Sequence, residues 1–152
     1  MGLTCSYGAY DGGYSLFNHW RRRVAQIAGL PPLEFMEGWY GFGAYKNLSY
    51  AFTARCGGNE EDIPTLVAFS EASLPIKWEC LKPDPLLYLL NHSDCDGEIT
   101  AKRSSRIADR LEELLLLWPE DTDMSKRLKL ITVQFIKGCR EAAAEGKPLL
   151  FI

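Results

Sequence analysis

The chain has 152 residues, of which 47% are hydrophobic and 24% are charged, a balance typical of globular proteins. Its 17 basic and 20 acidic residues give a net charge of −3, which argues against duplex nucleic acid as a partner, because that function usually needs a basic face. No apolar run approaches the roughly 20 residues that span a bilayer, and the first residues show no secretory signal. We therefore expect one globular domain over residues 1–152, located in the cytoplasm and without a membrane partner.

The five cysteines are odd in number, widely spaced and without a CxxC pair. This is neither a disulfide framework nor a zinc pattern. We expect free thiols in a reducing compartment, serving mostly as small core residues. They are Cys5, Cys56, Cys80, Cys95 and Cys139.

The first third of the chain predicts a strand, a turn and a helix. Apolar and polar residues alternate over residues 3–9, the period of a strand, and the glycine-rich "YDGGYS" at 10–15 predicts a turn. Residues 16–29 carry an apolar stripe at helical spacing. Ser15 is the expected N-cap of this helix and Gly29 its stop.

Beyond residue 32, the sequence predicts secondary structure more clearly in the C-terminal third than in the middle of the chain. Residues 33–82 suggest a small sheet, whereas Asp84 followed by proline predicts the start of a helix. Apolar spacing predicts two further helices, over about 107–118 and 123–146. The final "PLLFI" predicts a short strand, able to pair with the N-terminal one. The expected class is α+β, with a mainly helical C-terminal half and a small sheet from the N-terminal half.

The stretch "LLNHSDCDGEIT" has the outline of half an EF-hand loop. With His92 at loop position 1, Asp94 and Asp96 fall at positions 3 and 5 and Gly97 at position 6, as calcium loops require. Positions 1 and 12 depart from the pattern, because histidine replaces the first acid and Arg103 stands where a bidentate glutamate belongs. Three readings stay open: a well-made turn, a metal site at Asp94 and Asp96, or a catalytic loop. No cofactor is expected apart from calcium at this half loop.

The same stretch carries a resemblance. "LLNHSDCDGEIT", followed by "ADRLEELL" and a terminal "AAAEGKPLLFI", resembles a group of small bacterial and phage proteins with an LLNHSDCDGE-type motif. The resemblance covers residues 84–152 best. It implies a shared fold and an important loop from His92 to Glu98, and it carries over no catalytic assignment.

Two glycine-rich segments are candidate ligand sites. In the first, Tyr10 and Tyr14 flank a turn that opens a helix, where an anion is favoured. Arg21 belongs to a triplet of arginines whose side chains point in three directions, and a solvated helix face explains most of the triplet. These three residues, with His92, are candidate ligand contacts.

The second segment, "GWYGFGAYKN", places aromatic residues among glycines. Trp39, Tyr40 and Tyr45 could hold a planar group while Arg55 neutralises a phosphate. A core role is as good an explanation of these aromatics, because they bury the most apolar surface in a small domain.

Three functions remain after the sequence is read. The favoured one is a small-molecule-binding protein for a nucleotide-like ligand, and in a phage its use would be anti-defence, by sequestration of a nucleotide-derived immune signal. The alternatives are a hydrolase acting through His92, Asp94 and Asp96, and a protein-interaction or inhibitor module. An enzyme is disfavoured because nucleophile, base and orienting group cannot all be named. The oligomeric state stays open, and a homo-oligomer is compatible with the sequence.

Overall fold

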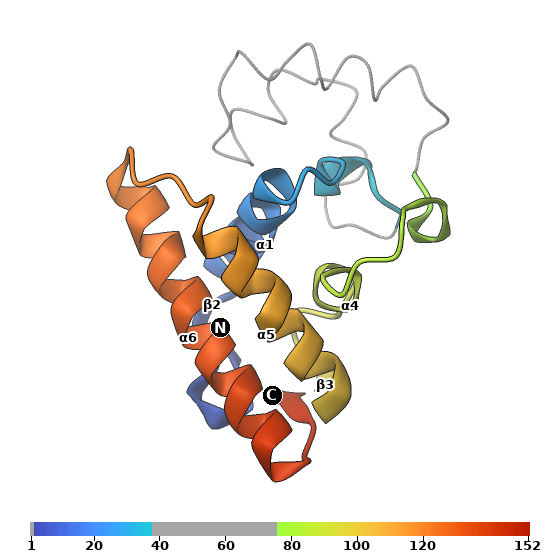
Figure 1. Cartoon of the computed structure of the whole chain (residues 1–152), viewed down its shortest axis with the longest axis vertical. Helices are drawn as coiled ribbons and strands as arrows, with labels where there is room; N and C mark the ends of the chain where they lie inside the picture. Colours follow the sequence, from blue (N-terminus) through green and yellow to red (C-terminus); the bar gives the residue numbers. More distant parts are fainter. Residues whose placement is uncertain (1, 38–75) are drawn as a thin grey trace. The chain divides into compact units, whose positions relative to one another are not determined.

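The chain is described by a computed structural model over residues 2–37 and 76–152. These residues form four α-helices and two small antiparallel sheets of two strands each (Figure 1). The predicted α+β class is confirmed. No helix in these two ranges is both long and apolar enough to cross a bilayer.

The described residues fall into two compact units. The larger one, here the helical unit, contains residues 2–21 and 84–152, and the smaller one contains residues 22–37 and 76–83. That residues 1–152 make one domain stays a prediction.

The helices and strands of the described residues have the following bounds. The helices are α1 Tyr14–Ile27, α4 Leu87–Leu90, α5 Ala101–Leu115 and α6 Asp123–Glu145. The strands are β1 Gly2–Thr4, β2 Asp11–Gly13, β3 Gly97–Ile99 and β4 Leu149–Phe151.

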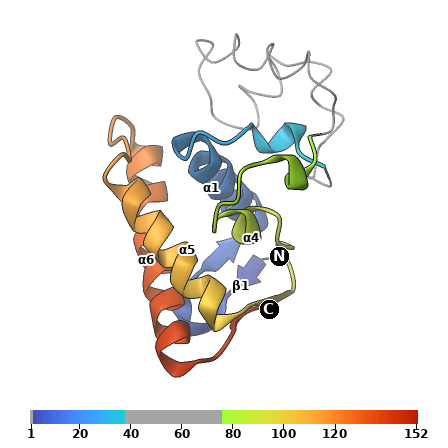
Figure 2. The ribbon, with the colours of Figure 1, turned by 45° about the vertical axis from the view of Figure 1, so that its right-hand side comes forward.

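Helices α5 and α6 form an antiparallel hairpin and lie side by side in both ribbon views (Figures 1 and 2). Their facing stripes are apolar, as the spacing predicts. Ile107 and Leu111 of α5 are fully buried, and so are Phe135 and Cys139 of α6. Burying such side chains contributes roughly 1.5–3 kcal/mol each for the large ones, so this hairpin supplies much of the core.

Specific residues cap the start of α6 and the ends of α6 and α1. The Thr122 hydroxyl oxygen accepts a hydrogen bond from the Ser125 amide at the start of α6. Gly146 ends α6 with φ +66°, and Gly29 follows α1 with φ +74°. Both glycines adopt the left-handed conformation that favours glycine, so the predicted stops are confirmed.

The N-terminal predictions need three corrections. The chain turns at Ser6–Gly8, so the strand expected over residues 3–9 ends at Thr4. The expected turn "YDGGYS" instead supplies β2, which pairs with β1. A Cβ atom on Gly2 would lie 2.7 Å from the Gly12 carbonyl oxygen, so close strand packing requires glycine here. The helix begins at Tyr14, which places the expected cap, Ser15, inside its first turn.

The C-terminal strand has two neighbours. β4 pairs with β3, and Phe151 lies opposite Gly97 in that ladder. Thr4 and Ile152 also exchange two main-chain hydrogen bonds, of 3.2 and 2.8 Å. The expected pairing with the N-terminal segment is therefore confirmed beside a pairing that the sequence did not indicate.

Aromatic rings connect α1 to α6 within the helical unit. The Trp20 ring centroid lies 5.6 Å from that of Phe17 and 4.9 Å from that of Phe135. The indole N–H of Trp20 donates to the Thr132 hydroxyl at 2.9 Å. The buried indole thus keeps a polar partner, as a stable core requires.

Four cysteines lie in the described ranges, and all four are free thiols as predicted. Cys5 and Cys139 are buried, and burial raises the pKa of each thiol to about 12. Both therefore stay protonated near neutral pH and act as small apolar residues. Cys80 and Cys95 are exposed, whereas Cys56 lies outside the described residues.

The smaller unit contains short turns and one isolated bridge. Leu33–Phe35 and Trp78–Cys80 each form a single 3₁₀ turn. Met36 pairs with Ile76 in a parallel bridge. A small sheet was expected over residues 33–82. Within the described part of that range, this bridge is a pairing of the sheet type; residues 38–75 lie outside the described residues.

Candidate functional site

The candidate site is the loop between α4 and β3, here the His92 loop, comprising Asn91–Asp96. Ser93 shapes its tip, because its hydroxyl oxygen accepts hydrogen bonds from the Cys95 and Asp96 amides at 3.2 and 3.4 Å. Such a serine turn explains how a short polar segment reverses direction.

The His92 ring is held on three sides. Its Nδ1 lies 2.8 Å from the carbonyl oxygen of Ser93, and its Nε2 lies 3.0 Å from that of Glu98. The ring also lies against Phe151, with 4.2 Å between centroids. Both nitrogens lie within hydrogen-bond distance of main-chain oxygens, so the chain itself orients the ring.

Gly97 makes this arrangement possible. Its φ is +105°, and a Cβ atom there would lie 3.1 Å from His92 Cε1. The glycine at the sixth loop position therefore serves the sharp turn and the close approach of the imidazole ring together.

Two side chains of α1, Asn18 and Arg21, also form hydrogen bonds that hold the His92 loop. The Asn18 amide donates to Asp94 Oδ2 at 2.8 Å, and Arg21 Nη2 donates to Asn18 Oδ1. Arg21 Nη1 donates to the carbonyl oxygens of Leu89, Leu90 and His92 at 3.3, 3.4 and 2.7 Å. Arg21 is only 3% exposed.

Arg21 thus caps the C-terminal end of α4. The last carbonyls of a helix lack partners within it and carry partial negative charge. A buried guanidinium satisfies them and, through Asn18, fixes Asp94. We name this set, Asn18, Arg21, His92 and Asp94, the loop clasp.

The metal prediction rests on Asp94 and Asp96. Among residues 2–37 and 76–152, no three His, Cys, Asp or Glu side chains cluster in a way that could hold a metal ion. Asp94 is engaged by Asn18, and the guanidinium of Arg103, at the twelfth loop position, lies over the Tyr88 ring. The prediction of a metal here gains no support from this geometry.

The remaining polar groups of the loop face outwards. Cys95 and Asp96 are exposed, and the Cys95 sulfur lies 3.3 Å from the Ser93 hydroxyl oxygen. A nucleophile needs a base that is in turn oriented by a third group. The two ring nitrogens of His92 lie beside the carbonyl oxygens of Ser93 and Glu98 rather than beside the Cys95 sulfur.

Of the predicted ligand residues in the described part of the chain, Arg21 and His92 are brought together, because Arg21 Nη1 donates to the His92 carbonyl oxygen. Tyr10 is 3% exposed, and its hydroxyl donates to the Gly13 carbonyl oxygen, so it is a core residue. Tyr14 is half-buried, and Arg21 belongs to the loop clasp. Four further predicted residues lie outside the described residues; they are Trp39, Tyr40, Tyr45 and Arg55.

The arginine triplet differs from the expected solvated face. Arg21 is buried, and Arg22 Nε forms a 2.6 Å ion pair with Glu34. Arg23 bonds to Gln26 on the same helix. One of the three guanidiniums thus holds the His92 loop and another holds the smaller unit.

Sequence reasoning missed Asn18 and Phe151 as neighbours of the loop. Asn18 stands one helical turn before Arg21, a spacing that puts both on one face. That spacing was a usable signal for Asn18. Phe151 reaches His92 only through the pairing of β3 with β4, which no local pattern indicates.

Comparisons with protein-family models, curated proteins and solved structures found no match to this chain.

Proposed function

We propose that this protein is a small-molecule-binding protein that holds a nucleotide-like ligand without transforming it. The observation that carries the proposal is that the chain itself engages His92 and Asp94 of the His92 loop. His92 faces two carbonyl oxygens, and Asp94 accepts from Asn18. Two of the three side chains that the hydrolase alternative would use, His92 and Asp94, are engaged in holding the fold, which favours binding over catalysis, whereas Asp96 is exposed.

The ligand class comes from residue chemistry. Aromatic rings stack on planar bases, and arginines neutralise phosphates. Trp39, Tyr40 and Tyr45 with Arg55 supply both kinds of group in one stretch of sequence. The resemblance to bacterial and phage proteins gives the finer form of the proposal, namely sequestration of a nucleotide-derived immune signal.

The test is to incubate the full chain with cell extract, wash it, denature it and identify the released small molecules by mass spectrometry. We expect an intact nucleotide-like compound at near-stoichiometric yield. Trp39→Ala and Arg55→Gln are expected to reduce that yield at least tenfold, since each removes one recognition contact.

The control is Arg23→Gln, which removes one arginine whose bond stays within α1 and should release as much ligand as the unaltered chain. An empty protein, or a metal without an organic ligand, would count against the proposal. The first result would leave a protein partner as the better explanation, and the second would return attention to Asp94 and Asp96.

A further inference from the structure

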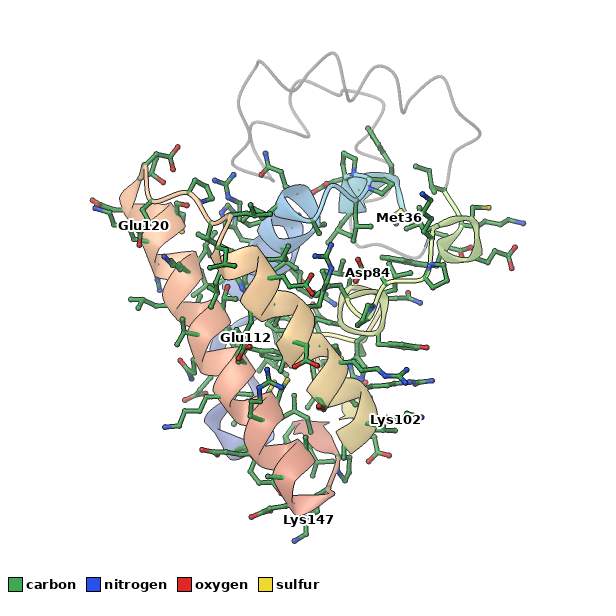
Figure 3. The ribbon with its side chains drawn as sticks, in the orientation of Figure 1. Met36, Asp84, Lys102, Glu112, Glu120 and Lys147 are labelled. Carbon is green, nitrogen blue, oxygen red and sulfur yellow. The ribbon has the colours of Figure 1, made fainter. Side chains whose placement is uncertain are left out.

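A basic surface lies where α4 faces α5. It consists of Tyr88, Lys102, Arg103 and Arg106, all exposed, and is called here the basic surface. The guanidinium carbon of Arg103 lies 4.0 Å from the centroid of the Tyr88 ring. Figure 3 labels Lys102 at the start of α5.

Helical spacing places these cations together. Arg103, Arg106 and Arg110 follow one another at i, i+3 and i+7, so they share the face of α5 that meets α4. Arg103 contacts Tyr88, and Arg110 contacts Asp84. Along the axis of α5, Arg106 therefore lies between these two contacts.

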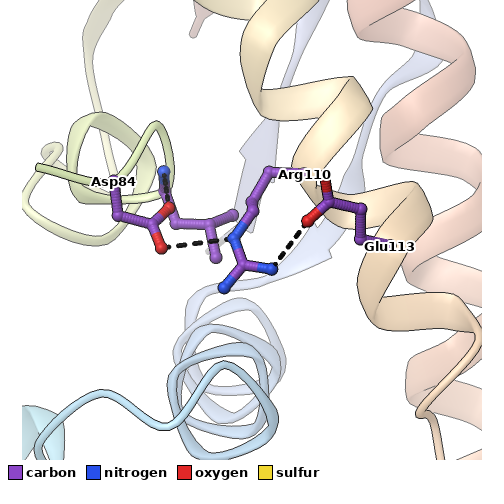
Figure 4. Close-up of polar contacts among 4 residues, drawn as sticks. Asp84, Arg110 and Glu113 are labelled. Atoms are coloured by element: carbon purple, nitrogen blue, oxygen red, sulfur yellow. Dashed lines mark hydrogen bonds and ion pairs between the residues drawn. The ribbon is translucent and has the colours of Figure 1, made fainter.

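Of the basic residues along this face of α5, Arg110 forms ion pairs with described carboxylates. Arg110 forms ion pairs with Asp84 at 3.2 Å and Glu113 at 2.9 Å (Figure 4). Lys102, Arg103 and Arg106 form no ion pair with any described residue. Three adjacent positive charges thus stand without a described carboxylate partner in a chain whose net charge is −3.

Their position is unfavourable for the helix itself. All three lie in the first two turns of α5, where the helix dipole is positive and acidic residues are favoured. The first turn of α5 contains no acid, whereas α6 begins with Asp123. The Thr100 hydroxyl already accepts from the Arg103 amide, so the side chains, not free main-chain amides, form this surface.

We propose that the basic surface binds the phosphate groups of the ligand, an inference that rests on the proposed function. Lys102 and Arg106, four residues apart on α5, would flank one phosphate. Stacking on Tyr88 fixes the plane of the Arg103 guanidinium and leaves its in-plane N–H groups free to donate to a second. The fitting class is a small nucleotide-like molecule with at least two phosphate charges.

The test uses inorganic pyrophosphate as the probe and ¹⁵N–¹H correlation spectra of the full chain as the readout. We expect saturable shifts centred on residues 100–106. Lys102→Gln with Arg106→Gln should weaken binding roughly tenfold or more, because two charge-assisted hydrogen bonds are lost. The same double variant should melt at an equal or higher temperature, since it removes cations from a helix start.

The matched control is Lys126→Gln with Arg127→Gln. It removes two exposed cations from the first turns of α6 and gives the same net charge. Its pyrophosphate affinity should stay within about twofold of the unaltered chain, because surface charges away from the site act only through a screened field.

Three results of the pyrophosphate experiments would overturn the inference. They are no binding of pyrophosphate, equal weakening in both double variants, and shifts centred away from α5. Anionic phospholipid vesicles serve as a further arm, and vesicle binding that pyrophosphate does not displace would overturn it in favour of a membrane surface. A nucleotide recovered from extract equally well by Lys102→Gln with Arg106→Gln would preserve the proposed function while removing this site from it.

Discussion

Arg21→Met is expected to lower the free energy of unfolding by about 3 kcal/mol. Methionine keeps the apolar stem but removes the guanidinium donors to the carbonyl oxygens of Leu89, Leu90 and His92; of these, the Leu89 oxygen keeps a main-chain donor, the His92 amide at 3.3 Å. Buried acceptors left without partners cost roughly 1–3 kcal/mol each, only part of which relaxation recovers. Urea unfolding followed by circular dichroism measures the change.

Arg23→Met is the matched control, since the Arg23 guanidinium bonds only within α1, to Gln26, among the contacts described for it. Its effect should stay within about 0.5 kcal/mol. Arg21→Lys should fall between the two, because an ammonium group retains the charge but not the fork that reaches both Asn18 and the carbonyls. If Arg21→Met and Arg23→Met were equally stable, Arg21 would have no role in holding the loop.

Gly138→Ala is expected to destabilise the protein by about 3 kcal/mol, despite the better helix propensity of alanine. A Cβ atom at position 138 would lie 2.4 Å from Ala9 Cβ and 2.6 Å from Ala9 Cα. Contacts this short force α6 away from the turn at Ser6–Gly8. That turn is anchored to α6 by a 2.7 Å hydrogen bond from Gln134 to the Gly8 carbonyl oxygen.

Thermal unfolding of Gly138→Ala and of Gly138→Ala combined with Ala9→Gly tests this packing. The second substitution removes the Ala9 Cβ but leaves its Cα and N close, so only part of the lost stability should return. Ala143→Gly, in the last turn of α6, is the control for helix propensity and should cost about 1 kcal/mol. A stabilised Gly138→Ala variant would mean that α6 and Ala9 do not approach as closely as described.

The two long helices could be predicted because their signals are local. The spacing of Ile107, Leu111 and Leu114 encodes the buried face of α5, and Gly146 ends α6 in the way its sequence position indicates. Apolar periodicity and terminal residues act over a few residues of chain, so sequence alone carries them.

The strands were harder because a strand forms only beside a partner, and no local pattern identifies that partner. β2 consists of one aspartate and two glycines, residues with little strand propensity, and it is a strand only because β1 lies beside it. The pairing of β3 with β4 likewise joins residues about fifty positions apart.

The resemblance implies that the stretch from His92 to Glu98 is important, and this stays a prediction. The role of each side chain depends on neighbours that the local sequence does not identify. The sequence predicts Arg21 as a candidate ligand contact, whereas in the structure it is buried and donates to the carbonyl oxygens of Leu89 and Leu90 at the end of α4. No helical pattern distinguishes an arginine that caps another helix from one that faces water.

The His92 loop is held by contacts with α1 and with the C-terminal strand. The loop clasp and Phe151 hold its polar groups in place, which leaves the basic surface and the aromatic sequence segment as candidates for ligand contact. We propose that His92 and Asp94 of the sequence motif serve the fold and that recognition takes place elsewhere on the chain.

The most direct test of non-catalytic binding is to incubate the compound recovered from extract, in tenfold excess, with the full chain and follow it by ³¹P NMR. We predict shifted or broadened phosphorus resonances and no new ones. Product resonances that exceed one equivalent per chain would contradict the account. Their loss in Asp94→Asn or Asp96→Asn, with the fold retained, would make the His92 loop an active site.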